Sequence, residues 1–233
     1  GTTVVSRSHD SIMREVRRMA ASEGFDGVIR DVGGPTANMY GIECAKKLSN
    51  GRCEDRRCLG GRPCPRLPID YSEQIRLLDD ISSVEGVRRV FIASGIRHDM
   101  VLADRRRGGE YLDRVVSEHV SGQMKVAPEH VCDDVLRLMG KPGRDALLGF
   151  KEMFDRCCRE RGKEEFLTYY LMAAHPGCTR DHMRKLASFC TRELGTHPEQ
   201  VQVFTPTPST YSTAMWWCGT DERGRPITVE RSI

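Results

Sequence analysis

The sequence predicts an α/β protein built on parallel strands. Short runs rich in β-branched and aromatic residues alternate with longer runs of helical period along most of the 233 residues. The predicted strands start about 35 to 60 residues apart, which leaves room for the crossover that a parallel return needs. Small, polar or proline residues follow each predicted strand, where the loops of parallel α/β folds carry their sites.

Each predicted element follows from its apolar pattern. In the first helix Ile12, Val16 and Met19 share one face, and Ser8 is suited to cap its N-terminus. The predicted strands cover residues 27–32, 87–93, 123–127, 166–173 and 200–204. The predicted helices cover residues 8–21, 72–84, 109–120, 133–139, 146–161 and 180–194.

The segments that follow the predicted strands contain the candidate site residues. Glycine and proline mark turns in any protein, but turn geometry does not require Glu129, His130 or His175. If all five strands are parallel, their exits converge at one opening. The exits are Gly33-Gly34-Pro35-Thr36, Ser94-Gly95-Ile96-Arg97, Pro128-Glu129-His130, His175-Pro176-Gly177 and Thr205-Pro206-Thr207-Pro208.

Composition narrows the class of protein. With 39% hydrophobic and 30% charged residues, the chain is typical of a globular protein rather than a disordered or collagen-like one. No apolar run approaches the roughly 18–20 residues that span a bilayer, and the first residues lack the apolar block of a signal peptide. Ten cysteines without such a leader indicate a reducing compartment, so we expect a cytoplasmic protein with free thiols. Disulfides are the alternative, although the adjacent Cys157 and Cys158 suit no ordinary bridge.

Four closely spaced cysteines follow the first predicted strand. Cys44, Cys53, Cys58 and Cys64 form the pattern C-x8-C-x4-C-x5-C, and thiolate quartets hold either zinc or an iron–sulfur cluster. The spacing does not choose between the two metals, and a loop without metal is the alternative. The net charge of +3 does not by itself indicate a nucleic-acid partner. Arginines nevertheless crowd this loop, where they can offset thiolate charge, meet an anionic substrate or simply face solvent: Arg52, Arg56, Arg57, Arg62 and Arg66.

Several longer motifs resemble one family. The run GFDGVIRDVGGPTANMYGIEC, the cysteine spacing, FIASGIRHD, KVAPEH, AAHPGCT and QVFTPTPSTYSTAM are similar to the YgiQ-like radical S-adenosylmethionine (SAM) proteins over residues 5–215. This resemblance implies a partial, TIM-like (β/α)6 radical SAM barrel of parallel strands. It also implies that SAM binds across the barrel and is cleaved by a 4Fe-4S cluster to a 5′-deoxyadenosyl radical.

The cluster motif of that superfamily, C-x3-C-x2-C, is missing from this sequence. We therefore expect a fragment whose first strand and 4Fe-4S ligands lie upstream of this chain. The core is expected over residues 1–218 with a cysteine-rich insertion at 41–68, followed by a poorly ordered polar tail at 219–233.

The resemblance assigns SAM-contacting roles to matching positions, but it names no catalytic residue. Gly33, Gly34, Pro35 and Thr36 match the glycine motif whose backbone meets the methionyl group. Ser94 and Arg97 end the next strand. Lys125 and Glu129 match positions that contact the ribose or carboxylate. His175 and Gly177 match the motif that packs by the adenine.

Two functions remain open at this point. The first is the SAM-binding barrel of a radical SAM enzyme with an unknown substrate, inactive as this chain alone. The second is a non-catalytic, zinc-stapled α/β module whose basic cysteine loop binds RNA or a protein partner. A C-x3-C-x2-C motif in the coding sequence upstream of Gly1 would favour the enzyme.

Overall fold

The computed structural model describes residues 5–34, 36–51, 53–54, 57–198 and 201–231. It divides the chain into two compact units, and the strands β3 and β4 and the helix α7 contribute residues to both. Unit 1 comprises Gly1–Cys58, Pro63–Val126 and Leu148–Thr168. Unit 2 comprises Leu59–Arg62, Ala127–Leu147 and Tyr169–Ile233.

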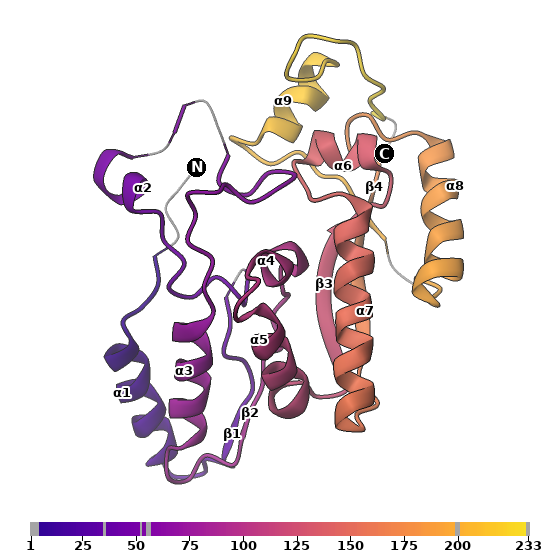
Figure 1. Ribbon diagram of the computed structural model, residues 1–233. Coiled ribbons are helices and arrows are strands. Elements are labelled where there is room, and N and C mark those ends of the chain that lie inside the picture. The colour runs from indigo at the N-terminus through magenta and orange to yellow at the C-terminus, as the bar shows by residue number, and fades with distance from the viewer. Residues whose placement is uncertain (1–4, 35, 52, 55–56, 199–200, 232–233) are drawn as a thin grey trace. The chain divides into compact units, whose positions relative to one another are not determined.

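Unit 1 contains a pair of short parallel strands with helices packed against them (Figure 1). β1 (Val28–Ile29) pairs with β2 (Arg89–Val90), and a further parallel bridge joins Ile96 to Val126 of β3 (Gln123–Glu129). The helices of this unit are α1 (His9–Ala20), α2 (Ala45–Asn50), α3 (Ser72–Ser82), α4 (His98–Ala103), α5 (Gly108–Arg114) and most of α7 (Arg144–Arg161).

The core of unit 1 is aromatic and aliphatic. The rings of Tyr71 and Tyr111 stack with centroids 4.3 Å apart, and both side chains are fully buried. Phe150 and Phe154 of α7 are also buried, one turn apart on the face that the apolar pattern predicts. At the start of α1, the hydroxyl of Ser8 accepts a hydrogen bond from the Ser11 amide at 3.3 Å, which confirms the expected N-cap.

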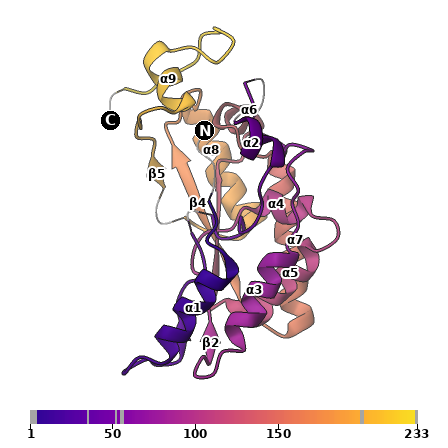
Figure 2. The ribbon, with the colours of Figure 1, turned by 90° about the vertical axis from the view of Figure 1, so that its left-hand side faces the viewer.

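Unit 2 contains the ends of two longer strands and a third short strand. The sheet order is β3-β4-β5, and β4 (Phe166–Ala173) runs parallel to β5 (Gln202–Val203), as Figure 2 shows. Met172 pairs with Gln202 and Ala173 with Val203. The helices of this unit are α6 (Asp133–Met139), α8 (Arg180–Phe189) and α9 (Tyr211–Cys218).

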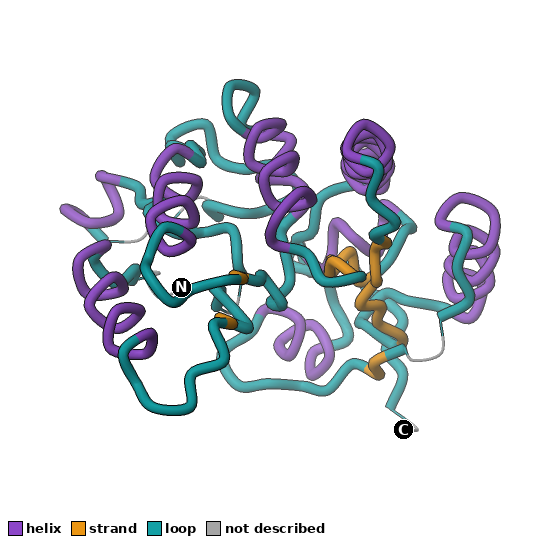
Figure 3. Tube along the Cα trace, turned by 90° about the horizontal axis from the view of Figure 1, so that it is seen from below, coloured by secondary structure: helices purple, strands orange, loops and turns teal. Residues whose placement is uncertain are grey.

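The predicted fold class is confirmed as a mixed α/β chain with parallel strands. The described strands form two small sheets that do not close into a barrel, so the partial barrel stays a prediction. β1, β2 and β5 are shorter than expected, and Figure 3 shows how much of the chain outside the helices is loop. Among the described helices none is long and apolar enough to cross a bilayer.

The residues that follow α9 fold back within unit 2. Thr220 bridges to Pro226, and the carbonyl of Thr228 accepts a hydrogen bond of 2.7 Å from the Gly177 amide. The guanidinium of Arg231 lies 5.5 Å from the centroid of the Trp216 ring. The part of the expected tail that the structure describes, 219–231, therefore contacts the loop after β4.

Candidate functional site at the strand exits

Asp31 joins the segment after β1 to the segment after β2 in unit 1 through hydrogen bonds. Its Oδ1 accepts hydrogen bonds from the amides of Ala93 at 2.9 Å and Ser94 at 3.1 Å, and its Oδ2 accepts one from the Ser94 hydroxyl. A carboxylate thus satisfies the amides of Ala93 and Ser94, which follow the last backbone bonds of Phe91 to Ile29 and Val32.

The two neighbouring glycines differ in their surroundings. A Cβ on Gly33 would lie 2.6 Å from Ser94 Oγ and 2.7 Å from Asp31 Oδ1, so the chain itself requires glycine there. A Cβ on Gly34 would meet no atom within 4 Å, and Gly34 is exposed. The space beside the Cα of Gly34 is therefore open, and the SAM contact that the resemblance implies stays a prediction. Thr36 is half-buried, and Pro35 lies outside the described residues.

This contrast gives a first testable expectation. Gly33→Ala should lower the free energy of unfolding by about 1–3 kcal/mol, because Ser94 must move and its hydrogen bonds to Asp31 are strained. Gly34→Ala, as the matched control, should change it by less than about 0.5 kcal/mol. Urea unfolding of both variants checks this, and equal effects would show that the close approach of Ser94 is not what requires Gly33.

Asn38 is a second link between these exits, and nothing in the sequence pattern predicts it. It is fully buried, and its amide donates to Tyr71 Oη at 2.8 Å and to the Arg97 carbonyl at 2.9 Å. Its Oδ1 accepts from the Arg97 amide at 2.8 Å. These bonds hold the backbone of the loop after β1 against the loop after β2. Asn38 belongs to the GGPTAN segment, but its partners are 33 and 59 positions away.

The two basic residues assigned by the resemblance lie in different environments. Arg97 makes a two-pronged ion pair with the buried Asp99, with distances of 3.0 and 2.7 Å, so the chain itself balances its charge. Lys125 is exposed, and its ammonium makes none of the hydrogen bonds or ion pairs found among the described residues. Its carbonyl accepts a bond of 2.9 Å from the Ile96 amide.

Glu129 is the most unusual residue at the exits of unit 2. Its φ of 67° lies in the left-handed region, which non-glycine residues rarely adopt outside functional or strained positions. Its Oε1 lies 3.2 Å from the Lys141 ammonium, which also donates to the Ala127 carbonyl at 3.1 Å. Its Oε2 is buried and has no hydrogen-bond partner among the residues that the structure describes. Burial raises the pKa of the Glu129 carboxyl, and the charge of Lys141 offsets part of that rise.

His130 and His175 are both buried and neutral. Burial, then the charge of His182, lowers the pKa of His130 to about 4, and burial lowers the pKa of His175 to about 4. His130 Nδ1 accepts from the Cys132 amide at 3.0 Å, so Nε2 carries the proton, 3.7 Å from Cys178 Sγ.

Both ring nitrogens of His175 are satisfied within the chain. Nδ1 donates to the Pro176 carbonyl at 2.9 Å, and Nε2 accepts from the Ser212 hydroxyl at 2.8 Å. The ring meets Phe204 edge-on, with centroids 5.3 Å apart. His175 is thus suited to pack against a ligand rather than to hydrogen-bond it.

Gly177 is explained by the conformation of its own loop. Its φ is 87°, and a Cβ there would overlap Leu138 Cδ1. Its amide is already used by the carbonyl of Thr228. The structure thus gives this glycine a backbone role, and the adenine contact that the resemblance implies stays a prediction.

The four cysteines of the predicted metal centre do not form a binding group in the structure. Cys44 is buried at the start of α2, and Cys53, Cys58 and Cys64 are half-buried. The Cys64 amide donates to the Cys58 carbonyl at 2.8 Å, which closes a short loop. Within the described ranges, no three His, Cys, Asp or Glu side chains are gathered closely enough to hold a metal ion. The arrangement does not fit a metal as it stands, and the metal centre stays a prediction.

The metal prediction can be checked directly. Elemental analysis of anaerobically purified chain should find about one zinc, or several irons with sulfide, per molecule. Cys53→Ser or Cys58→Ser should release the metal, because each removes one thiolate ligand. Cys218→Ser, which changes an exposed cysteine outside the loop, should retain it. A wild-type chain free of metal would exclude the centre.

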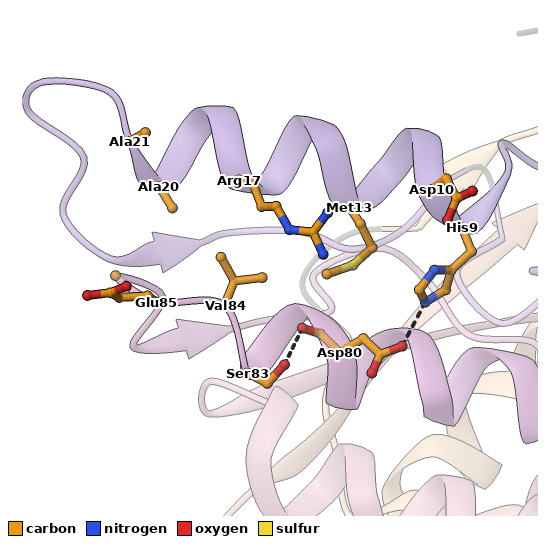
Figure 4. Close-up of a pocket in the computed structure, with 11 residues that line it drawn as sticks. His9, Asp10, Met13, Arg17, Ala20, Ala21, Asp80, Ser83, Val84 and Glu85 are labelled. Carbon is orange, nitrogen blue, oxygen red and sulfur yellow. Dashed lines mark hydrogen bonds and ion pairs between the residues drawn. The ribbon is translucent and has the colours of Figure 1, made fainter.

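One large cavity lies elsewhere in unit 1. Its volume is about 880 Å³, and it lies between α1 and α3, where His9 Nε2 approaches Asp80 Oδ2 at 2.9 Å (Figure 4). Its lining continues to residues at the C-terminal ends of both helices, such as Ala21 and Glu85. None of the site residues predicted from the sequence lines it. We place the candidate site at the strand exits because the strained backbone and the unpaired carboxylate oxygen are there.

The fold and these exits define an α/β chain whose polar residues follow parallel strands. No model of a known protein family matches the chain. It is 51% identical over 221 residues to a UPF0313 protein of Fusobacterium nucleatum, covering 95% of this chain and 39% of that protein. It is 43% identical to a UPF0313 protein of Methanocella arvoryzae, covering 100% of this chain and 38% of the relative. It is 41% identical to a UPF0313 protein of Methanosarcina mazei, covering 99% of this chain and 36% of that protein.

The chain is therefore a homologue of one part of the UPF0313 proteins, which are the YgiQ-like family. This confirms the resemblance at the level of homologous proteins. The chain spans less than two fifths of the length of these three relatives. Their shared name states no activity.

Proposed function

We propose that this chain is the SAM-binding part of a radical SAM enzyme. The resemblance of its motifs and its UPF0313 relatives support this proposal. The single observation that carries it is Glu129, whose buried Oε2 has no partner at the end of a strand with a left-handed backbone. A buried carboxylate oxygen without a partner is costly unless a ligand supplies the missing donor.

The chemistry of Glu129 fits a donor-rich ligand such as a ribose diol. Lys141 holds Oε1 and so orients the carboxylate, which leaves Oε2 to accept a hydrogen bond from a ligand hydroxyl. At Gly34 the open main chain offers amide and carbonyl groups for a polar ligand group. When bound, SAM and a reduced 4Fe-4S cluster supply the 5′-deoxyadenosyl radical. In this proposal the residues of this chain bind and orient SAM. The partial barrel is also proposed, and the substrate is unknown.

Binding of S-adenosylhomocysteine, an unreactive analogue of SAM, tests the role of Glu129. Glu129→Gln keeps the shape of the side chain and removes its charge, so affinity should fall at least about tenfold, as expected for a hydrogen bond to a charged group. Glu164→Gln, a change at an exposed glutamate, is the matched control and should bind like the wild type. Calorimetry on the chain, and on a version extended upstream, measures both. Equal affinity of the two variants would contradict the proposal.

The alternative, a non-catalytic zinc-stapled module, requires a metal at the cysteine quartet. No group in the described part of the chain favours it. The elemental analysis above, combined with the binding experiment, separates the two functions.

A further inference from the structure

Two neighbouring cavities in unit 2 share part of their lining. One, of about 630 Å³, lies along α8, and the other, of about 410 Å³, lies along α6 and the start of α7. Asp133 and Arg144 line both. Each volume is in the range of about 300–1,000 Å³ that is usual for ligand pockets. The shared residues make the two cavities parts of one surface.

This surface concentrates positive charge. Seven arginine and lysine residues line the two cavities, and we call this group the basic strip. Beside the shared Arg144, the first cavity is lined by Arg184, Lys185 and Arg192. The second is lined by Arg62, Arg137 and Lys141. Asp133, Asp134 and Asp145 also line the cavities, and Glu129 and Asp181 pair with Lys141 and Arg184, so the seven cations and these five carboxylates give a net charge of +2.

The chain itself leaves part of this charge unbalanced. Arg144, Lys185 and Arg192 are exposed, and none of their side chains takes part in an ion pair or hydrogen bond found in the described ranges. Two of the three lining carboxylates already have partners within the chain. Asp133 Oδ1 accepts from the Arg144 amide at 2.9 Å, and Asp134 Oδ2 lies 3.0 Å from His182 Nε2.

We infer that the basic strip binds the phosphate backbone of single-stranded nucleic acid. Its cations are spread over two joined cavities, so they match a ligand with repeated negative charges better than a single anion. Most are arginines, whose planar guanidinium matches phosphate oxygens in pairs. A flexible single strand can place successive phosphates in both cavities, and we expect a stiffer duplex to reach fewer of the cations. The strip offers charge, so binding is independent of base sequence.

A second group of arginines supplies the matched control. Arg7, Arg14, Arg17 and Arg18 line a smaller cavity of about 370 Å³ on α1 in unit 1. There Arg7 forms an ion pair with Glu15. Reversing Arg14 and Arg18 changes the net charge of the chain by the same amount as reversing two arginines of the strip.

Fluorescence anisotropy with labelled RNA and DNA strands of about 12 nucleotides tests the inference on the purified chain. At about 50 mM salt, both strands should bind with similar affinity in the micromolar range. Arg144→Glu combined with Arg192→Glu should weaken binding at least about tenfold. The slope of log K against log salt should fall by about 0.7 for each phosphate that is no longer neutralised. Arg14→Glu combined with Arg18→Glu should leave affinity within about twofold of the wild type.

Four outcomes would overturn the assignment. The first is no binding of either strand, and the second is equal loss of binding in the strip variant and the control variant. The third is tighter binding of duplex, and the fourth is displacement of the strand by polyglutamate as effectively as by unlabelled RNA of the same charge. Arg144→Lys with Arg192→Lys, which keeps the charge, should retain most of the binding, and equal loss in this variant would also contradict a role for charge. Because Arg144 and Arg192 are not among the residues assigned to SAM, loss of nucleic-acid binding and loss of S-adenosylhomocysteine binding are separate results.

Discussion

The purified chain is expected to release no 5′-deoxyadenosine from SAM under a strong reductant, whereas a version extended upstream through a C-x3-C-x2-C motif is expected to release it. Reductive cleavage needs an iron site with an open position that chelates SAM, and that chemistry belongs to the cofactor. The described residues of this chain gather no group able to hold such a metal. Gly34 and Glu129, which we propose contact SAM, cannot supply an electron.

Two glycine variants of the extended protein test whether turnover needs the open space beside Gly34. Gly34→Val fills the open space beside the main chain and should lower turnover. Gly109→Val is the matched control, because a Cβ there also meets no atom within 4 Å, and it should turn over like the extended wild type. Chromatographic measurement of 5′-deoxyadenosine gives all the rates. Turnover by the chain without extension would mean that the Cys44–Cys64 quartet is itself the redox centre.

Stability is expected to fall steeply as the pH drops from about 7.5 to about 5. His130 and His175 have pKa values of about 4 in the folded chain, well below the ordinary value of about 6.5 that holds in the unfolded chain. Between these values the unfolded chain binds more protons, so the stability that neutral histidines contribute is complete above about pH 6.5 and is lost as the pH falls towards 4. The expected loss at pH 5 is about 2 kcal/mol for each histidine.

Other titrating groups modify this dependence. Burial lowers the pKa of His119 in unit 1, which adds to the loss. The raised pKa of Glu129 acts in the opposite direction, because the folded chain then binds a proton more readily than the unfolded chain. Urea unfolding at pH of about 7.5 and about 5 measures the combined effect of these groups on the free energy of unfolding. His175→Gln should make the dependence clearly shallower, and His197→Gln, at an exposed histidine, should not. An unchanged slope in His175→Gln would show that this histidine is not held neutral by burial.

The elements with strong local signals were predicted well. The range of β4, Phe166–Ala173, and that of α6, Asp133–Met139, agree with the predicted ranges. The predicted helix at 109–120 exists, but it starts at Gly108 and ends in a π-helical turn, Val115–His119. α8 likewise continues into a π-helical turn, Cys190–Leu194. Apolar period identifies such elements because each buries one face.

Three short helices were missed. α2 and α4 have only six residues each, and the apolar residues of the eight-residue α9 do not gather on one face. α4 is covered on most of its length, since His98, Asp99, Met100 and Val101 are all buried, so no amphipathic pattern marks it. α9 starts at Tyr211 after its N-cap Thr210, whose hydroxyl accepts from the Thr213 amide, and it follows the segment 205–208 that was interpreted as a strand exit.

The candidate site was predicted in part. Glycine and charged residues after strands are visible in the sequence, and so Glu129 and His175 were predicted. Asp31, Asn38 and Lys141 were not, because their importance depends on partners elsewhere in the fold. Asp31 acts through residues 62 and 63 positions away. Lys141 follows a helix and reaches back 12 positions to Glu129. Local pattern contains no information about such pairings.

The left-handed residue after β4 has a consequence for engineering the protein. Ala174, with φ of 58°, follows β4 directly, just as Glu129 ends β3 with a similar value. Replacing Glu129 by glycine would remove a side chain of the candidate site. Replacing Ala174 by glycine removes only a methyl group. Relief of such backbone strain is worth about 1 kcal/mol, and the greater freedom of glycine in the unfolded chain offsets part of it. Ala174→Gly is therefore a conservative first substitution for a more heat-resistant protein that keeps the neighbouring His175 in place.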